Sequence, residues 1–242
     1  MILAFGEVEE GKMYTQLPGA SQLQYGGSSI PDVARSGQLD ALIALERIGT
    51  RSRFSRNQQI YCQGESGGEC WYRVISGTVR ITNLLQDGRR HIAEFCFSDD
   101  GFGLESTAER SFSAEAVGDV TVMRYPRAAT ERLAEGYPAV ARLLRDMALK
   151  SLTAAQSRLI ILGRMTATER VVSFLLELSE RFDSEKHIEL PMCRCDIGDY
   201  LGLTIETVCR VFSDLKRRGV IEVLPHSITL LDRFAIEAMG ED

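Results

Sequence analysis

The sequence predicts an α+β fold in which an N-terminal β-roll, a long helix and a C-terminal winged helix-turn-helix follow one another. Three patterns support this prediction. Short alternating strands with Gly and Asp turns fill residues 54–127, a helical pattern runs from about 138 to 163, and residues 193–223 join two short helices by a tight turn. We therefore divide the chain into an arm, a roll, a long helix and a winged helix-turn-helix, at residues 1–36, 37–136, 137–163 and 164–242.

Composition sets the broad class of the protein. With 44% hydrophobic and 26% charged residues among 242, the chain has the make-up of an ordinary globular protein. No apolar run approaches the roughly 20 residues that span a bilayer. The N-terminus, MILAFGEVEEGKMY, has no basic leader. We therefore expect a cytoplasmic protein with no membrane partner.

The residues that carry chemistry argue against an enzyme. The sequence has no P-loop, G-x-S-x-G, H-E-x-x-H or dinucleotide fingerprint, and it has three histidines. Six cysteines occur without a C-x-x-C pair, and the spacing of Cys193, Cys195, Cys209 and His187 matches no familiar zinc motif. We predict a protein without catalytic activity, without a metal site and without another cofactor.

The N-terminal region changes character near residue 37. Residues 1–36 include PGASQLQYGGSSIPD and show little periodicity, which predicts a flexible arm. Residues 38–47, QLDALIALER, predict a short helix with Leu39, Leu42, Ile43 and Leu45 facing inward.

Residues 54–127 favour strands. In WYRVISGTVRIT, Tyr72, Val74, Val79 and Ile81 alternate around a Gly turn, and QDGRR predicts a hairpin through Asp87-Gly88. Many short strands at close spacing are typical of a small barrel or roll.

The segment after Pro126 favours helices. RAATERLAEG ends at Gly136, and Pro138 stands at the first turn of a long helix, where proline is tolerated. Apolar residues then recur every seven residues, as in a coiled-coil seam. The predicted seam consists of Ala141, Ala148, Leu152, Ala155, Leu159 and Leu162. Small alanines would let two helices approach closely, so we predict a parallel homodimer; the alternative is a helix that packs only on its own roll.

The last part of the chain predicts a winged helix. Gly163 is expected to act as a hinge, and MTATERVVSFLLELSERF predicts a helix capped by Thr166 or Thr168, with Glu169 in its first turn. HIELP follows as a short strand. The helix-turn-helix turns at Gly202-Leu203, the wing turns at residues 225–227, and residues 232–239 form a final helix.

The second helix of the helix-turn-helix has the residues to read DNA. Glu206 and Arg210 are four residues apart and therefore share one face. A carboxylate can accept from the cytosine amino group, and a guanidinium can donate two bonds to guanine O6 and N7. The pair is spaced to touch neighbouring base pairs in a major groove. The net charge of −6 bears on solubility and long-range attraction rather than on such local contacts.

The order of these elements resembles the CRP/FNR family of bacterial transcription regulators over about residues 38–235. The most specific stretch is IGDYLGLTIETVCRVFSDLKRRGVI, and GESGGECWYRVISGTVRI resembles the early strands of that family's cyclic-nucleotide-binding roll. The resemblance implies a homodimer that binds two-fold palindromic double-stranded DNA and contacts RNA polymerase.

Residues that bind an effector or cofactor in other branches of the family are missing from this sequence, and their absence indicates the branch. A cyclic-nucleotide site in this family has an arginine directly before a serine, but Phe112 precedes Ser113 here. Arg110 would face the same side of a strand, so a regulator gated by a cyclic nucleotide or another small ligand remains the alternative. An FNR-like iron–sulfur centre needs N-terminal cysteines, and the first cysteine is Cys62. A haem branch would need axial ligands, for which His91 is a weak candidate.

What remains resembles the FixK branch, whose members activate genes of low-oxygen respiration and nitrogen metabolism without an obligatory effector. Ile205, where a CRP-like helix has arginine, suits a thymine methyl and points to a TTGA-N6-TCAA palindrome. Cys209 stands where the FNR pattern has serine. The expected base contacts are Ile205, Glu206, Cys209 and Arg210. The expected phosphate contacts are Cys193, Arg194, Thr204, Thr207 and Lys216.

Two cysteines flank Arg194 at the start of the first helix. A helix N-terminus and a neighbouring arginine both lower the pKa of a thiol. Oxidation of Cys193 or Cys195 to a sulfinic acid would then place negative charge beside DNA phosphate. We expect one of them, Cys193 first, to be a redox-sensitive brake; the alternative is a cysteine that caps the helix as serine would.

Overall fold

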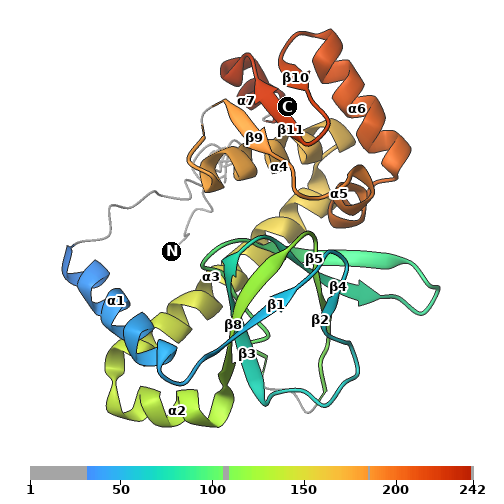
Figure 1. The fold of residues 1–242 in the computed structure, drawn as a ribbon. Coiled ribbons are helices and arrows are strands. Elements are labelled where there is room, and N and C mark those ends of the chain that lie inside the picture. The colour runs from blue at the N-terminus through green and yellow to red at the C-terminus, as the bar shows by residue number, and fades with distance from the viewer. Residues whose placement is uncertain (1–31, 106–108, 185, 241–242) are drawn as a thin grey trace, which may run out of the picture.

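The computed structural model describes residues 32–105, 109–184 and 186–240, and it confirms the predicted α+β fold (Figure 1). An eight-stranded roll is joined by the long helix α3 to a winged helix. Most of the predicted arm lies outside the described residues. Helix α1 (Asp32–Glu46) takes in its last five residues and so begins earlier than the pattern predicted.

The inward face predicted for α1 is right for Leu45 and Leu42 but wrong for Leu39 and Ile43. Ala41 and Leu45, four residues apart, are fully buried against the roll and α3, whereas Leu39 and Ile43 are exposed. The prediction for Leu39 and Ile43 was wrong because a short helix with apolar residues on two faces does not say which face meets the core.

The roll consists of two four-stranded antiparallel sheets, with strand orders β1-β8-β3-β6 and β2-β7-β4-β5. The strands are β1 (Thr50–Phe54), β2 (Gln59–Tyr61), β3 (Cys70–Ser76), β4 (Val79–Leu84), β5 (Arg90–Cys96), β6 (Gly101–Phe102), β7 (Ser113–Ala116) and β8 (Val120–Pro126). Buried residues at alternating positions of both sheets, among them Val74, Val79 and Val122, fill the space between them. The predicted hairpin joins β4 and β5 through Gly88, which has a φ of +84°.

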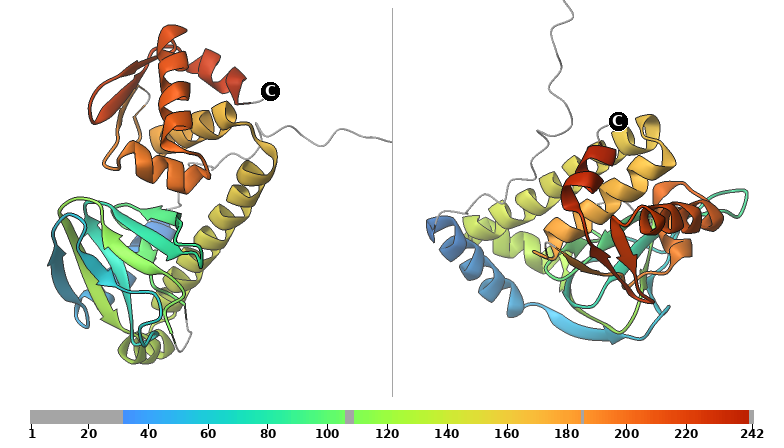
Figure 2. Two further views of the ribbon diagram at one scale, coloured as in Figure 1. Left: turned by 90° about the vertical axis from the view of Figure 1, so that its right-hand side faces the viewer. Right: turned by 90° about the horizontal axis from the view of Figure 1, so that it is seen from above.

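Helices α2 (Arg127–Gly136) and α3 (Pro138–Arg164) cover one side of the roll. Val140 and Leu143 of α3 are buried against Trp71 and Tyr125 of the roll. Helix α3 then continues past the roll to the winged helix (Figure 2). Gly163 is the next-to-last residue of α3 and stands directly before the break between α3 and α4, so its role as a hinge remains a prediction.

The winged helix begins with α4 (Ala167–Arg181). Thr166 and Glu169 form a reciprocal capping box at the N-terminus of this helix. Strands β9 (His187–Glu189), β10 (Ile221–Val223) and β11 (Ser227–Leu230) form a small sheet in the order β10-β11-β9, and α7 (Arg233–Met239) ends the described chain.

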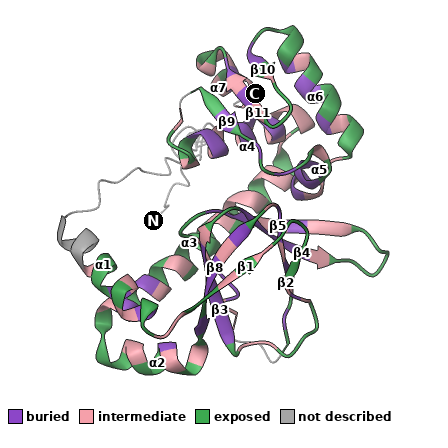
Figure 3. Ribbon diagram, in the orientation of Figure 1, coloured by how far each residue is buried: buried purple, intermediate pink, exposed green. Residues whose placement is uncertain are grey.

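Buried residues occur in both the roll and the winged helix (Figure 3), and the core of the winged helix includes residues of the roll. Ile92, Phe95 and Phe97 of β5 belong to the same buried cluster as the apolar faces of α4 to α6. The ring of Phe95 lies 5.0 Å from that of Tyr200. The winged helix therefore rests directly on β5.

Candidate nucleic-acid interface

The helix-turn-helix is formed by α5 (Arg194–Leu201) and α6 (Ile205–Arg217). Helix α5 ends at Gly202, whose φ of +64° is the left-handed conformation that glycine adopts most easily. The Thr204 hydroxyl accepts the Thr207 backbone N–H at 3.2 Å and so begins α6. The two predicted helices and the turn between them are confirmed.

Helix α6 separates an apolar face from a polar one. Val208, Val211, Phe212 and Leu215 are buried in the core of the winged helix. The four predicted base-contacting residues all lie on the exposed part of the helix: Ile205, Glu206, Cys209 and Arg210. The structure therefore brings them together on a single surface.

The two charged residues of this surface are available to a ligand. The carboxylate of Glu206 accepts from its own backbone N–H and from the Thr204 hydroxyl, and both bonds lower its pKa. Glu206 is thus an anionic acceptor at neutral pH. Within the described ranges, no carboxylate pairs with Arg210.

The predicted phosphate-contacting residues occupy different positions. Thr204 is exposed at the start of α6, Thr207 is half-buried with its hydroxyl 3.1 Å from that of Thr204, and Lys216 is exposed in the last turn. Arg194 is half-buried, and its guanidinium lies 3.8 Å above the ring of Phe212. Desolvation lowers the pKa of Arg194. This arginine is therefore packed on the core of the winged helix instead of extending into solvent.

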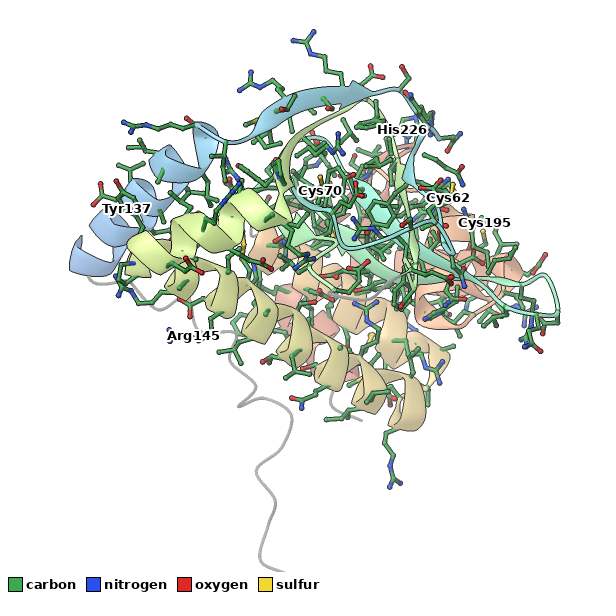
Figure 4. All side chains as sticks on the ribbon, turned by 90° about the horizontal axis from the view of Figure 1, so that it is seen from below. Cys62, Cys70, Tyr137, Arg145, Cys195 and His226 are labelled. Atoms are coloured by element: carbon green, nitrogen blue, oxygen red, sulfur yellow. The ribbon has the colours of Figure 1, made fainter. Side chains whose placement is uncertain are left out.

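The two candidate redox cysteines differ in their surroundings. The Cys193 sulfur accepts the Asp196 backbone N–H at 3.4 Å, as an N-cap does. Cys195 is exposed on α5 (Figure 4), and its pKa is raised, first by desolvation and then by the charges of Asp199 and Cys193. The expected lowering of the thiol pKa is therefore wrong for Cys195.

Arg110 is used inside the roll. Its side chain is 5% exposed and donates to the carbonyls of Gly103 (3.1 Å) and Cys70 (2.5 Å) and to the Glu105 carboxylate (3.0 Å). The guanidinium also lies 4.3 Å above the ring of Tyr61. In the described part of the roll, protein acceptors thus take three of the bonds that the guanidinium could offer to a ligand phosphate.

The predicted dimer seam is uncovered in the single chain. Leu152 and Leu159 are 54% and 73% exposed, the seam alanines are exposed, and Leu162 is half-buried. Arg145 is exposed on α3, the helix that carries the seam. Tyr137 lies between α2 and α3 (Figure 4). Leu149 and Ile160, which the heptad analysis did not include, are also about half exposed.

The described residues contain no group of three or more His, Cys, Asp or Glu side chains placed to hold a metal ion. None of their helices has the length and apolar character required to cross a bilayer.

One contact was not anticipated from the sequence. Arg80 and Arg90 of the roll form ion pairs with Asp196 and Asp199 of α5. These partners are separated by more than 100 residues along the chain, so no local motif could indicate them.

Two domain families match the chain. Residues 51–137 match the cyclic nucleotide-binding domain, and residues 169–239 match the Crp-like helix-turn-helix domain. The first covers the roll, and the second covers the winged helix.

Known proteins match over most of the chain. The nitrogen fixation regulation protein FixK of Bradyrhizobium diazoefficiens is 39% identical over 84% of this chain and 87% of its own. The transcriptional activatory protein AadR of Rhodopseudomonas palustris is 35% identical over 81% of this chain and 83% of its own. The solved structure of FixK2 from Bradyrhizobium japonicum covers 81% of this chain and 98% of its own, with 38% identity and a TM-score of 0.76. By their names these relatives regulate genes and are not enzymes.

Proposed function

Since the chain belongs to the CRP/FNR family of transcription regulators, we propose that it is a homodimeric activator that binds a TTGA-N6-TCAA palindrome without an obligatory effector. Its targets would be genes of low-oxygen respiration or nitrogen metabolism. The names of the FixK relatives support targets in nitrogen metabolism, and the name of AadR supports an activator.

The exposed Arg210, which pairs with no carboxylate of the described residues, and the ionised Glu206 beside it carry this proposal. The G·C pair of a TTGA half-site offers guanine O6 and N7 to the guanidinium of Arg210 and the cytosine amino group to the carboxylate of Glu206. Ile205 would contact a thymine methyl group. Cys209 would lie near the outermost base, where a thiol donates only weakly.

Phosphate contacts would fix this helix in the groove. Thr204, Thr207 and Cys193 lie at the starts of α6 and α5, where backbone N–H groups favour an anion. Lys216 would meet the backbone at the other end of α6. Arg194 would have to turn its guanidinium away from Phe212 to do the same.

The dimer would form along α3. Leu152 and Leu159 of the predicted seam are exposed, and burying them between two copies would remove them from water. The dimer would then hold two copies of α6 about one DNA turn apart, which a two-fold palindrome requires.

Effector independence is supported by Arg110. Because its guanidinium is bonded to Gly103, Cys70 and Glu105, a ligand phosphate would have to break these contacts. In the alternative, a regulator gated by a cyclic nucleotide or another small ligand, Arg110 would exchange these protein partners for the ligand.

Selection of sites from random DNA by the purified protein, with no small molecule added, tests the proposal. We expect TTGA-N6-TCAA sites to be enriched, and we expect cyclic nucleotides to leave the melting temperature unchanged. Enrichment only after a cyclic nucleotide is added, together with a raised melting temperature, would establish the gated alternative.

We also propose that Cys193 is the redox-sensitive brake. Two molecules of hydrogen peroxide convert one thiol to a sulfinic acid and release two water molecules, and the new negative charge would lie at the start of α5, facing phosphate. Peroxide is expected to lower DNA binding by the parent at least tenfold, whereas Cys193→Ser, which keeps a capping oxygen, retains binding.

The matched control for this experiment is Cys195→Ser, which should lose binding to peroxide as the parent does. A gel-shift titration gives both results. Equal sensitivity of Cys193→Ser and the parent would refute the brake.

The remaining partners follow from the proposed activity. An activator at a promoter acts by contacting RNA polymerase, and both DNA and polymerase lie in the cytoplasm of a bacterium. We therefore propose a cytoplasmic protein.

A further inference from the structure

The first helix of the helix-turn-helix is attached to the roll by a buried ionic cluster. The Asp196 carboxylate, 3% exposed, receives Arg80 Nη1 at 3.2 Å and Arg90 Nη2 at 2.6 Å. Arg90 also donates to Asp199 at 2.8 Å, and Nδ1 of His91 lies 3.1 Å from the Asp199 carbonyl oxygen. Two neighbouring strands of the roll, β4 and β5, thus bind two successive turns of α5.

The cluster is anchored on the roll side as well. Arg80, 8% exposed, donates to the Glu115 carboxylate of β7 at 2.9 Å and to the Asn57 side chain at 3.1 Å. Every nitrogen of its guanidinium therefore has a partner. A guanidinium held by several acceptors has little freedom to move, so the position of Asp196 is defined relative to the β2-β7-β4-β5 sheet of the roll.

Such a cluster favours orientation over stability. The cost of removing charges from water offsets most of their attraction, and in some proteins buried polar or ionic groups instead contribute geometric specificity. The apolar contact between β5 and α4 to α6 already holds the winged helix against the roll, through side chains such as Phe95 and Phe174. Apolar packing alone tolerates small rotations, whereas ion pairs near 2.6–3.2 Å at Asp196 do not.

We propose that Asp196, Arg80 and Arg90 are positioning residues for DNA binding, which set the angle of α6 relative to the roll and α3. Helix α5 packs on α6, so its attachment to the roll determines where the reading surface points. The proposal rests on the proposed function, a dimer on a palindrome. In that dimer the cluster would determine which spacer between half-sites is accepted.

One base pair more or less in the spacer moves a half-site by about 3.4 Å and turns it by about 35°. A reading helix fixed on the roll cannot follow that change. A reading helix released from the roll can follow it by rotating about the end of α3.

The test is binding to palindromes with spacers of five, six and seven base pairs. The parent should bind the five- and seven-base-pair sites at least tenfold more weakly than the six-base-pair site. Asp196→Asn and Arg90→Gln should reduce this penalty to less than threefold. Arg90 is 30% exposed, so its replacement gives a variant that folds if the buried asparagine does not.

Arg73→Gln is the matched control. Arg73 is 6% exposed and pairs at 2.8 Å with the exposed Asp99, and no ion pair joins it to α5 among the described residues. It should keep the spacer preference of the parent even if its affinity falls. Unchanged spacer preference in both cluster variants would overturn the inference, as would relaxed preference in the control. Absence of binding by the parent at every spacer would instead overturn the proposed function.

Discussion

Arg210→Ala is expected to abolish specific binding to a TTGA palindrome while leaving the fold and the dimer intact. The side chain is exposed and, among described residues, unpaired, so its removal leaves no buried charge behind. A bidentate contact with guanine discriminates by about 1–3 kcal/mol, and a dimer makes two, so the loss should be roughly 2–6 kcal/mol. Fluorescence anisotropy with the palindrome and with a scrambled site measures it.

Arg217→Ala is the matched control on the same helix. Arg217 is exposed near the end of α6 and pairs with Asp214, so it can contribute at most a backbone contact. Its loss should weaken binding to both sites alike and reduce the dependence of affinity on salt. Specific binding by Arg210→Ala equal to that of the parent would refute the assignment of the reading surface.

Replacing Leu152 and Leu159 together by glutamate is expected to produce a folded monomer. Each buried leucine contributes about 1.5–3 kcal/mol, and a parallel dimer would bury four of them while forcing carboxylates together in the variant. The two positions are exposed in the single chain, so the roll and winged helix should keep their structure. Sedimentation at micromolar concentration and circular dichroism give the two measurements.

Thr153→Glu is the control for this pair. Thr153 is exposed on α3 outside the predicted seam, and its hydroxyl donates to the Leu149 carbonyl. A dimer is expected for Thr153→Glu. A dimer in the Leu152 and Leu159 variant as well would show that another surface joins the subunits.

The winged helix was predictable because its signals are local. Thr204 caps α6, Gly202 supplies the left-handed turn, and the apolar positions of α6 repeat with helical spacing. Each of these features acts within four residues, so the sequence alone defines the helices and the surface that carries Glu206 and Arg210.

Features that depend on distant residues could not be predicted in this way. The inward face of α1 depends on which part of the roll it meets, and the partners of Arg110 come from β3 and from the segment after β6. The contact of Arg80 with Asp196 joins positions 116 residues apart. Such pairings follow from the packed structure and leave no periodic trace in the chain.

The buried cluster that Ile92, Phe95 and Phe97 share with α4 to α6 limits how the protein can be recombined. A chimaera that joins the roll of one relative to the winged helix of another at residue 164 would place unmatched side chains against Phe174 and Tyr200. Exchange of DNA specificity between relatives should therefore succeed when only the exposed residues of α6 are transplanted, or when β5 is transferred together with the winged helix.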